Sequence, residues 1–171
     1  MNGQTDNRGD PASGDPATGV ERLVVEGLRC WLAGYRDGRI ETWETAWSLF
    51  ARTLGVTRAR AAVSALSCYA RALNTWAKVG FEMMPSECPG RWAHECLAIA
   101  LVSAWQRGRR EEAAGIADEL VVSGGLPETL EAAANLADTL RRLDMVLPHG
   151  PGCFARALAG LAPVPGNTTR H

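Results

Sequence analysis

Residues 92–106 read WAHECLAIALVSAWQ, and within them Cys96 to Val102 is an unbroken apolar run. These seven residues would make about two turns of an α-helix. A helix that is apolar on every side is normally buried, with amphipathic helices packed around it. The stretch therefore predicts a central buried helix that the rest of the chain covers.

The segments on both sides of this stretch carry apolar residues at helical spacing. In the clearest of them, Ile40, Trp43, Trp47, Phe50 and Leu54 fall on one helical face. Similar faces, separated by turns that contain glycine, predict helices over 20–35, 39–54, 58–78, 92–106, 109–122 and from Pro127 onward. No segment of strand-like length alternates between apolar and polar residues. The sequence predicts an all-α protein, a compact bundle of about six antiparallel helices around 92–106.

The two ends of the chain differ in composition from its middle. Residues 1–19 are rich in Gly, Asp, Pro and Asn, and so few apolar side chains do not offset the entropy of ordering, which predicts a disordered tail. Residues 148–171 again contain much Gly and Pro, which predicts a flexible tail, although 153–161 are compatible with a short helix. A single all-α domain is expected over 20–147.

Charge and cysteine usage narrow the functional class. The net charge of −1 argues against a general nucleic-acid or anionic-membrane binder. The longest apolar stretch is about ten residues, and a membrane span needs about 20, so no membrane association is expected. The N-terminus lacks the basic and apolar regions of a signal peptide, and the cysteines are odd in number, five. A cytoplasmic protein with reduced thiols is expected.

Two short stretches resemble each other. Tyr35, Gly38, Arg39 and Glu41 align with Trp105, Gly108, Arg109 and Glu111 at one fixed offset. Each stretch predicts a helix end, a tight turn and a new helix that begins with an acidic residue. The second turn also resembles that of tetratricopeptide hairpins, over this one turn only. The match indicates either an internal repeat of helical hairpins or the same turn chemistry used twice, and we favour the second interpretation.

The most suggestive chemical cluster is Cys88, His94 and Cys96. Thiolate and imidazole groups are the ligands that zinc prefers, and both also bind iron. His94 and Cys96 are two residues apart on the predicted helix, so they point to nearly opposite sides and cannot both reach one metal ion. A metal or redox site would need Cys88 with one of them and further ligands, of which Cys68 is the nearest candidate. Buried cysteines more often act as small apolar side chains.

Signatures of catalysis are missing from the sequence. The zincin motif needs a second histidine where Ala98 stands, and a di-iron bundle needs a glutamate where Arg91 stands. The chain has no phosphate-binding loop, dinucleotide fingerprint or nucleophile elbow. An enzyme is not expected.

The spacing of apolar and turn residues over 49–71 resembles that of a degenerate helix-turn-helix. Arg58, Arg60, Arg71 and Lys78 would give its second helix a basic outer face able to contact phosphate. That helix is too long for the usual unit, and the protein is not basic overall. DNA is therefore an alternative partner that the sequence does not favour.

The leading hypothesis is a non-enzymatic protein-interaction or regulatory module without a cofactor. Its partner is expected to be a protein that binds the polar stripe of 58–78, including Arg58, Arg60, Arg71 and Lys78, together with the loop 79–91. The alternatives are a DNA-binding transcription regulator that uses 49–71 and a zinc or iron sensor that uses the cysteine and histidine cluster.

Overall fold

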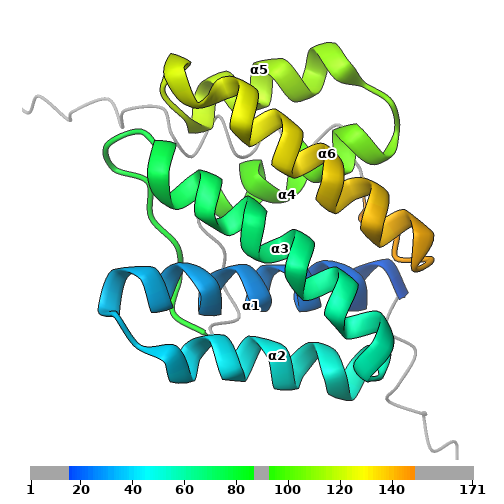
Figure 1. Cartoon of the computed structure of the whole chain (residues 1–171). Coiled ribbons are helices and arrows are strands. Elements are labelled where there is room, and N and C mark those ends of the chain that lie inside the picture. The colour runs from blue at the N-terminus through cyan, green and yellow to red at the C-terminus, as the bar shows by residue number, and fades with distance from the viewer. Residues whose placement is uncertain (1–15, 87–92, 149–171) are drawn as a thin grey trace, which may run out of the picture.

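The computed structural model describes residues 16–86 and 93–148 (Figure 1). Its α-helices are α1 (Pro16–Asp37), α2 (Ile40–Leu54), α3 (Val56–Trp76), α4 (Ala93–Gln106), α5 (Arg110–Leu120) and α6 (Leu126–Arg142), with a short 3-10 helix, η1 (Ser123–Gly125), before α6. Within the described residues no strand forms, and the isolated bridge between Ala77 and Val121 is the extent of β pairing there. The prediction of an all-α bundle is confirmed.

The observed helix boundaries differ from the predicted ones at two N-termini. Helix α1 begins at Pro16, so residues 16–19 are helical although we expected them in the N-terminal tail. Proline is well suited to a first helical turn, because its φ angle is already helical and the amide hydrogen it lacks would have no partner there. Helix α3 begins at Val56, two residues before the predicted start at 58. The rest of the predicted tails, with the predicted short helix at 153–161, lies outside the described residues.

Helix α3 lies between two groups of helices. It packs against α1 and α2 on one side and against α6 on the other, and α4 packs against α5, α6 and α1. Figure 1 shows α1 and α2 side by side below α3, with α6 running along α3 above it. The fold is thus a helical bundle in which α3 joins α1 and α2 to α6.

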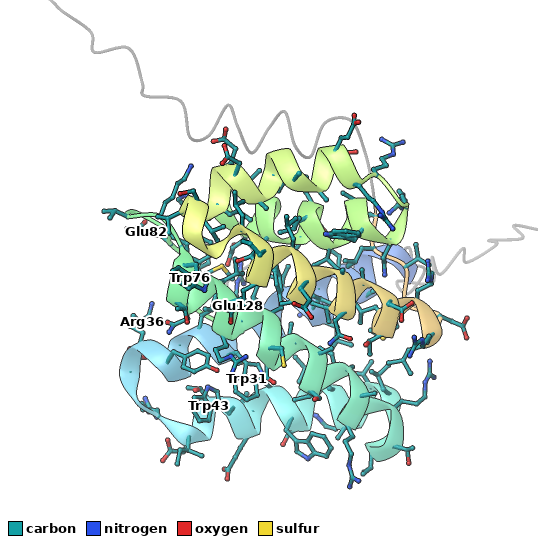
Figure 2. All side chains as sticks on the ribbon, turned by 45° about the horizontal axis from the view of Figure 1, so that its top comes forward. Trp31, Arg36, Trp43, Trp76, Glu82 and Glu128 are labelled. Atoms are coloured by element: carbon teal, nitrogen blue, oxygen red, sulfur yellow. The ribbon has the colours of Figure 1, made fainter. Side chains whose placement is uncertain are left out.

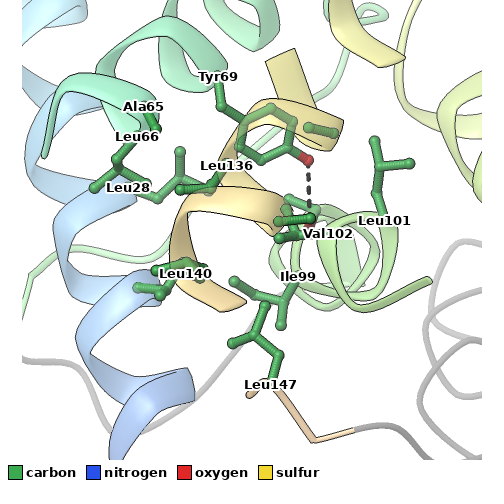
Figure 3. Close-up of a cluster of buried hydrophobic side chains, with 14 of the residues drawn as sticks. Leu28, Ala65, Leu66, Tyr69, Ile99, Leu101, Val102, Leu136, Leu140 and Leu147 are labelled. Carbon is green, nitrogen blue, oxygen red and sulfur yellow. Dashed lines mark hydrogen bonds between the residues drawn. The ribbon is translucent and has the colours of Figure 1, made fainter. Parts of the chain in front are cut away.

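The predicted central helix is buried, but it shares the core with α3. Nine of the 14 residues of α4 are buried, and nine of the 21 residues of α3 are buried as well. Five of those nine in α3 are alanines, whose small side chains let helices approach closely on both sides. In the core the Tyr69 hydroxyl donates a 2.9 Å hydrogen bond to the Ala98 carbonyl, which links α3 to α4 (Figure 3). Burial raises the pKa of this phenol well above its ordinary value.

The similarity of the two turns extends to the whole fold. Gly38 and Gly108 both have positive φ, 65° and 69°, and they lie 70 residues apart. The starts of α2 and α5 (40 and 110) and of α3 and α6 (56 and 126) are separated by the same 70 residues. Six buried positions of α2 and α3 also recur as buried positions of α5 and α6, 70 residues later: 46, 50, 59, 63, 66 and 70 match 116, 120, 129, 133, 136 and 140. The structure therefore favours an internal repeat of a three-helix unit, α1–α3 and α4–α6, over the shared turn chemistry that we expected.

Candidate binding cleft

A non-helical segment, residues 77–86, connects α3 towards α4. Two of its backbone N–H groups bind side chains of α4: that of Glu82 donates to His94 Nδ1 at 3.3 Å, and that of Met84 donates to Glu95 Oε1 at 2.9 Å. At the far end the hydroxyl of Ser86 lies 3.5 Å from the Cys30 thiol of α1. The 77–86 segment is therefore attached to both α1 and α4.

A buried ion pair lies beneath this segment. Arg29 of α1 and Glu95 of α4 form a bidentate pair, with Nε donating to Oε1 at 2.6 Å and NH2 donating to Oε2 at 2.9 Å. Their side chains are 2% and 0% exposed. Glu26 accepts a further bond from Arg29 at 2.7 Å. Because it also accepts the Met84 amide, the Glu95 carboxylate joins α1, α4 and the 77–86 segment at one point.

Two pKa values near this point are shifted by their surroundings. The hydrogen bond that Arg29 donates to Glu95 raises the pKa of Arg29, against the opposing effect of burial, so the guanidinium stays charged. Partial burial lowers the pKa of His94, and the nearby Glu82 carboxylate partly opposes that shift. The His94 ring also packs on Phe81, with 5.3 Å between ring centroids. The neutral form of His94 suits the bond it accepts from Glu82, because a protonated Nδ1 has no lone pair to offer.

Between α1, the end of α3 and the 77–86 segment lies a cleft of about 510 Å³. This volume is within the range of ligand pockets, roughly 300–1,000 Å³. The apolar part of its wall comes mainly from Leu32, Ala33, Leu73, Phe81, Met83 and Met84. Figure 2 shows Arg36 and Glu82 at the end of the molecule that also carries Trp76. The lining of the cleft thus includes both apolar and charged side chains, and we call its exposed charged residues, Arg36, Lys78 and Glu82, the entrance.

The charged side chains around the cleft differ in their exposure and in the groups that they contact. Arg29 is buried and is met by the carboxylates of Glu26 and Glu95. Arg36 and Lys78 are exposed, as is Glu82. Arg36 pairs with its neighbour Asp37 at 3.0 Å, and Lys78 donates to the carbonyl oxygen of Asp118. The entrance thus offers two cations and one carboxylate to a ligand.

The predicted metal ligands do not converge in the described part of the chain. Cys68 is exposed on α3, Cys96 is half-buried on α4, and His94 accepts the amide of Glu82. Cys88 lies outside the described residues. Among the residues that are described, no group of three or more His, Cys, Asp or Glu side chains could hold a metal ion. A zinc or iron site that includes Cys88 stays a prediction.

Three of the four predicted partner-binding cations contact the protein itself. Arg58 donates to the Leu143 carbonyl just beyond α6, Lys78 donates to the Asp118 carbonyl in the last turn of α5, and Arg71 lies 3.9 Å from Glu128. Carbonyl groups at helix C-termini attract cations, so Arg58 and Lys78 stabilise these ends. Arg60 is exposed, and no ion-pair or hydrogen-bond partner of it is seen among residues 16–86 and 93–148. The stripe therefore attaches α3 to α5 and α6, and of these four cations Lys78 alone is among the residues that line the described cleft.

The arrangement of α3 does not support the helix-turn-helix interpretation of 49–71. A recognition helix must leave a broad face free to enter a DNA groove. Helix α3 packs against α1, α2 and α6 instead, which leaves a narrow exposed strip that includes Arg60, Ser64 and Arg71. DNA binding through this helix stays an untested alternative without structural support.

Sequence reasoning missed the two residues that organise the site, Arg29 and Glu95. The sequence feature that could have identified them is a charged residue among apolar ones. Glu95 directly precedes Cys96 to Val102, and Arg29 stands between Leu28 and Cys30. Either residue alone suggests a solvent-exposed position. Only the packing of α1 against α4 shows that they are partners.

Comparisons with known proteins give no guide to function. No protein-family model matches the chain, and no curated protein or solved structure matches it significantly. Among the described residues, no helix has both the length and the apolar character needed to cross a membrane.

Proposed function

We propose that this protein is a non-enzymatic protein-interaction module whose partner binds at the cleft between α1, α3 and the 77–86 segment. The observation that supports the proposal is the cleft of about 510 Å³ with an apolar wall and exposed cations at its entrance. Interfaces between proteins are commonly dominated by a few large side chains that enter such pockets. A regulatory role is consistent with this proposal, because a partner in the cleft would contact the 77–86 segment, which is attached to both α1 and α4.

The composition of the wall supports a peptide-like ligand. Phe81, Met83 and Met84 are half-buried although they belong to a segment without regular structure. Methionine side chains are flexible and polarizable, so they adapt to different apolar groups and are frequent at binding surfaces. The loop 79–91 was expected to form part of the partner surface, and its described part, 79–86, lies largely along the cleft.

A selection from a random peptide library displayed on phage tests the proposal. The full-length protein is the bait, and the selected peptides are measured against an Ala33→Trp variant, whose indole would fill the cleft. Ala61→Trp is the matched control, because Ala61 is exposed on α3 and is not among the cleft residues. Far-UV circular dichroism and thermal melting confirm that both variants are folded.

Selected peptides should lose at least about tenfold in affinity for Ala33→Trp, or about 1.4 kcal/mol, and should keep it for Ala61→Trp. The proposal fails if every selected peptide binds the two variants equally.

A further inference from the structure

The internal repeat identifies the counterpart of the cleft in the second half of the molecule. Four cleft residues lie on one face of α1, at positions 29, 32, 33 and 36. Adding the repeat offset of 70 gives positions 99, 102, 103 and 106 on α4. We therefore compared what covers the two faces.

The face of α4 is covered by residues 143–148, which follow α6. Gln106 donates from Nε2 to the Met145 carbonyl at 2.8 Å and accepts the Leu147 amide at Oε1 at 2.9 Å. The hydroxyl of Ser103 donates to the Pro148 carbonyl at 3.1 Å. The side chains of Met145 and Leu147, two residues apart, are buried, and that of Val146 between them is 52% exposed. This alternation is what an extended segment produces when it lies along a surface.

The corresponding face of α1 is covered less completely: the 77–86 segment lies over Arg29, whereas Leu32 and Ala33 are half-buried and Arg36 is exposed. One reason is that α3 is longer than α6. Helix α6 ends at Arg142, which corresponds to position 72, whereas α3 continues to Trp76. The chain therefore leaves α3 about one turn later than it leaves α6. The space beside Leu32, Ala33 and Arg36 is the cleft.

We infer that the cleft binds an extended segment of a partner protein, which carries two apolar side chains two residues apart and an acidic residue beside them. This inference rests on the proposed interaction function. The pair of apolar residues follows from the way Met145 and Leu147 cover α4. The acidic residue follows from Lys78, the exposed cation of the lining that pairs with no carboxylate among the described residues. The charges of Arg29 and Arg36 are already met by Glu26, Glu95 and Asp37. Arg36, in the place of Gln106, can only donate hydrogen bonds, so it would bind carbonyl or carboxylate oxygens.

The chain itself supplies the probe for this inference. A fluorescein-labelled synthetic peptide LDMVLP, with the sequence of residues 143–148, contains an acidic residue followed by the two apolar side chains. Its binding to the full-length protein is measured by fluorescence anisotropy, together with LDSVSP, which lacks both apolar side chains. Saturable binding is expected for LDMVLP, with at least about a tenfold loss for LDSVSP and for the Ala33→Trp protein but not for Ala61→Trp.

A charge exchange tests the acidic residue separately. The Lys78→Glu protein should bind LDMVLP several-fold more weakly and should bind the peptide LKMVLP more tightly than the wild type does, because the opposite charges are restored. Arg60→Glu is the control, since Arg60 is exposed on α3 away from the cleft. An equal effect of Arg60→Glu on LDMVLP would mean that only the overall charge matters, and it would overturn the assignment of the acidic residue to the entrance.

Three further outcomes would overturn the inference. If phage-selected peptides depend on Ala33 but lack paired apolar residues, and LDMVLP does not bind, the extended-segment inference fails while the interaction function stands. If LDMVLP binds only to a full-length variant with Phe154→Asp and Leu158→Asp, the cleft belongs to the chain's own C-terminal residues and not to a partner. If neither LDMVLP nor any selected peptide depends on Ala33, the inference and the proposed function fail together.

Discussion

At the scale of single residues, the Glu95 carboxylate determines how the site is held together. It is fully buried, and it binds Arg29 of α1 and the Met84 amide of the 77–86 segment. Removing a charged group from water costs several kcal/mol, and a well-formed partner offsets that cost only when its geometry is good. The Arg29–Glu95 pair therefore contributes little net stability. Its main effect is to determine how α1 packs against α4.

We predict that Glu95→Gln lowers the free energy of unfolding by about 3–5 kcal/mol, because it leaves the buried Arg29 guanidinium without its main counter-charge. Urea titration monitored by tryptophan fluorescence measures the change. Glu44→Gln is the control, since Glu44 is exposed on α2 and its loss should change stability by less than about 0.5 kcal/mol. A similar small effect of Glu95→Gln would show that Arg29 is not held in a buried pair.

His94 provides a pH-dependent contact at the same scale. Its lowered pKa means that the folded state favours the neutral ring. The stabilisation that the neutral His94 ring gives the folded state is then fully present above the ordinary histidine pKa, about 6.5. It is lost as the pH falls from that value towards the lowered pKa of the folded state. Among the described residues, Glu82 is the charged group that acts on the ring.

We predict that the stability difference between the wild type and His94→Gln shrinks as the pH falls from 7.5 to 5, because protonation removes the acceptor for the Glu82 amide. Urea midpoints across this range measure it. Amide hydrogen exchange should show the protection of Glu82 decreasing over the same range in the wild type, after correction for the intrinsic exchange rate. A difference that stays constant with pH would contradict the assignment of His94 as a neutral acceptor.

At the scale of helices, glycines decide how closely α1, α2 and α3 approach one another. A Cβ atom on Gly27 of α1 would lie 2.6 Å from Phe50 Cε2 and 2.7 Å from Leu66 Cδ2, both of which are side-chain atoms in the core. Gly115 of α5 has no atom within 4 Å of such a Cβ. Gly27 therefore allows close packing of α1 against its neighbours, whereas Gly115 makes no close contact and only lowers the stability of α5.

We predict opposite effects for the same substitution at these two sites. Gly27→Ala should destabilise the protein by about 1–3 kcal/mol through overpacking. Gly115→Ala should stabilise it by roughly 0.5–1 kcal/mol, because alanine loses less backbone entropy in a helix than glycine does. Thermal unfolding followed by circular dichroism compares them. Equal effects of the two substitutions would show that α1 does not meet α2 and α3 at Gly27.

At the scale of the whole molecule, the two three-helix halves share one core. Leu66 of α3 and Leu136 of α6 occupy equivalent positions 70 residues apart, and both are buried in the cluster that Figure 3 shows. Because α3 packs against α6 along this cluster, neither half can lose its core without exposing that of the other. The halves are therefore expected to unfold together.

We predict that Leu66→Ala and Leu136→Ala each lower the free energy of unfolding by about 2–5 kcal/mol while leaving a single transition. Tryptophan fluorescence, which reports mainly on the first half, and far-UV circular dichroism, which reports on both, should give coincident curves. Val146→Ala, at a side chain that is 52% exposed, is the control and should have a small effect. Two separate transitions in either core variant would mean that the halves fold independently.

The fold class and most helices could be predicted from the amino-acid sequence, because the spacing of apolar residues is a local signal. The faces with Trp43, Trp47 and Phe50 in α2 and the apolar run in α4 were sufficient to predict both helices within a residue or two. The turns at Gly38 and Gly108 were visible for the same reason, since a left-handed backbone conformation favours glycine at a helix end.

The tertiary structure alone decided which charged side chains are buried, where the cleft lies and how the two halves match. Arg29 and Glu95 are 66 residues apart, and neither has a local pattern that marks it as buried. The cleft depends on the difference in length between α3 and α6 and on the path of the 77–86 segment. These features arise from contacts between residues distant in the sequence, and the energy of such contacts depends on the packing geometry of whole helices, which local periodicity does not contain.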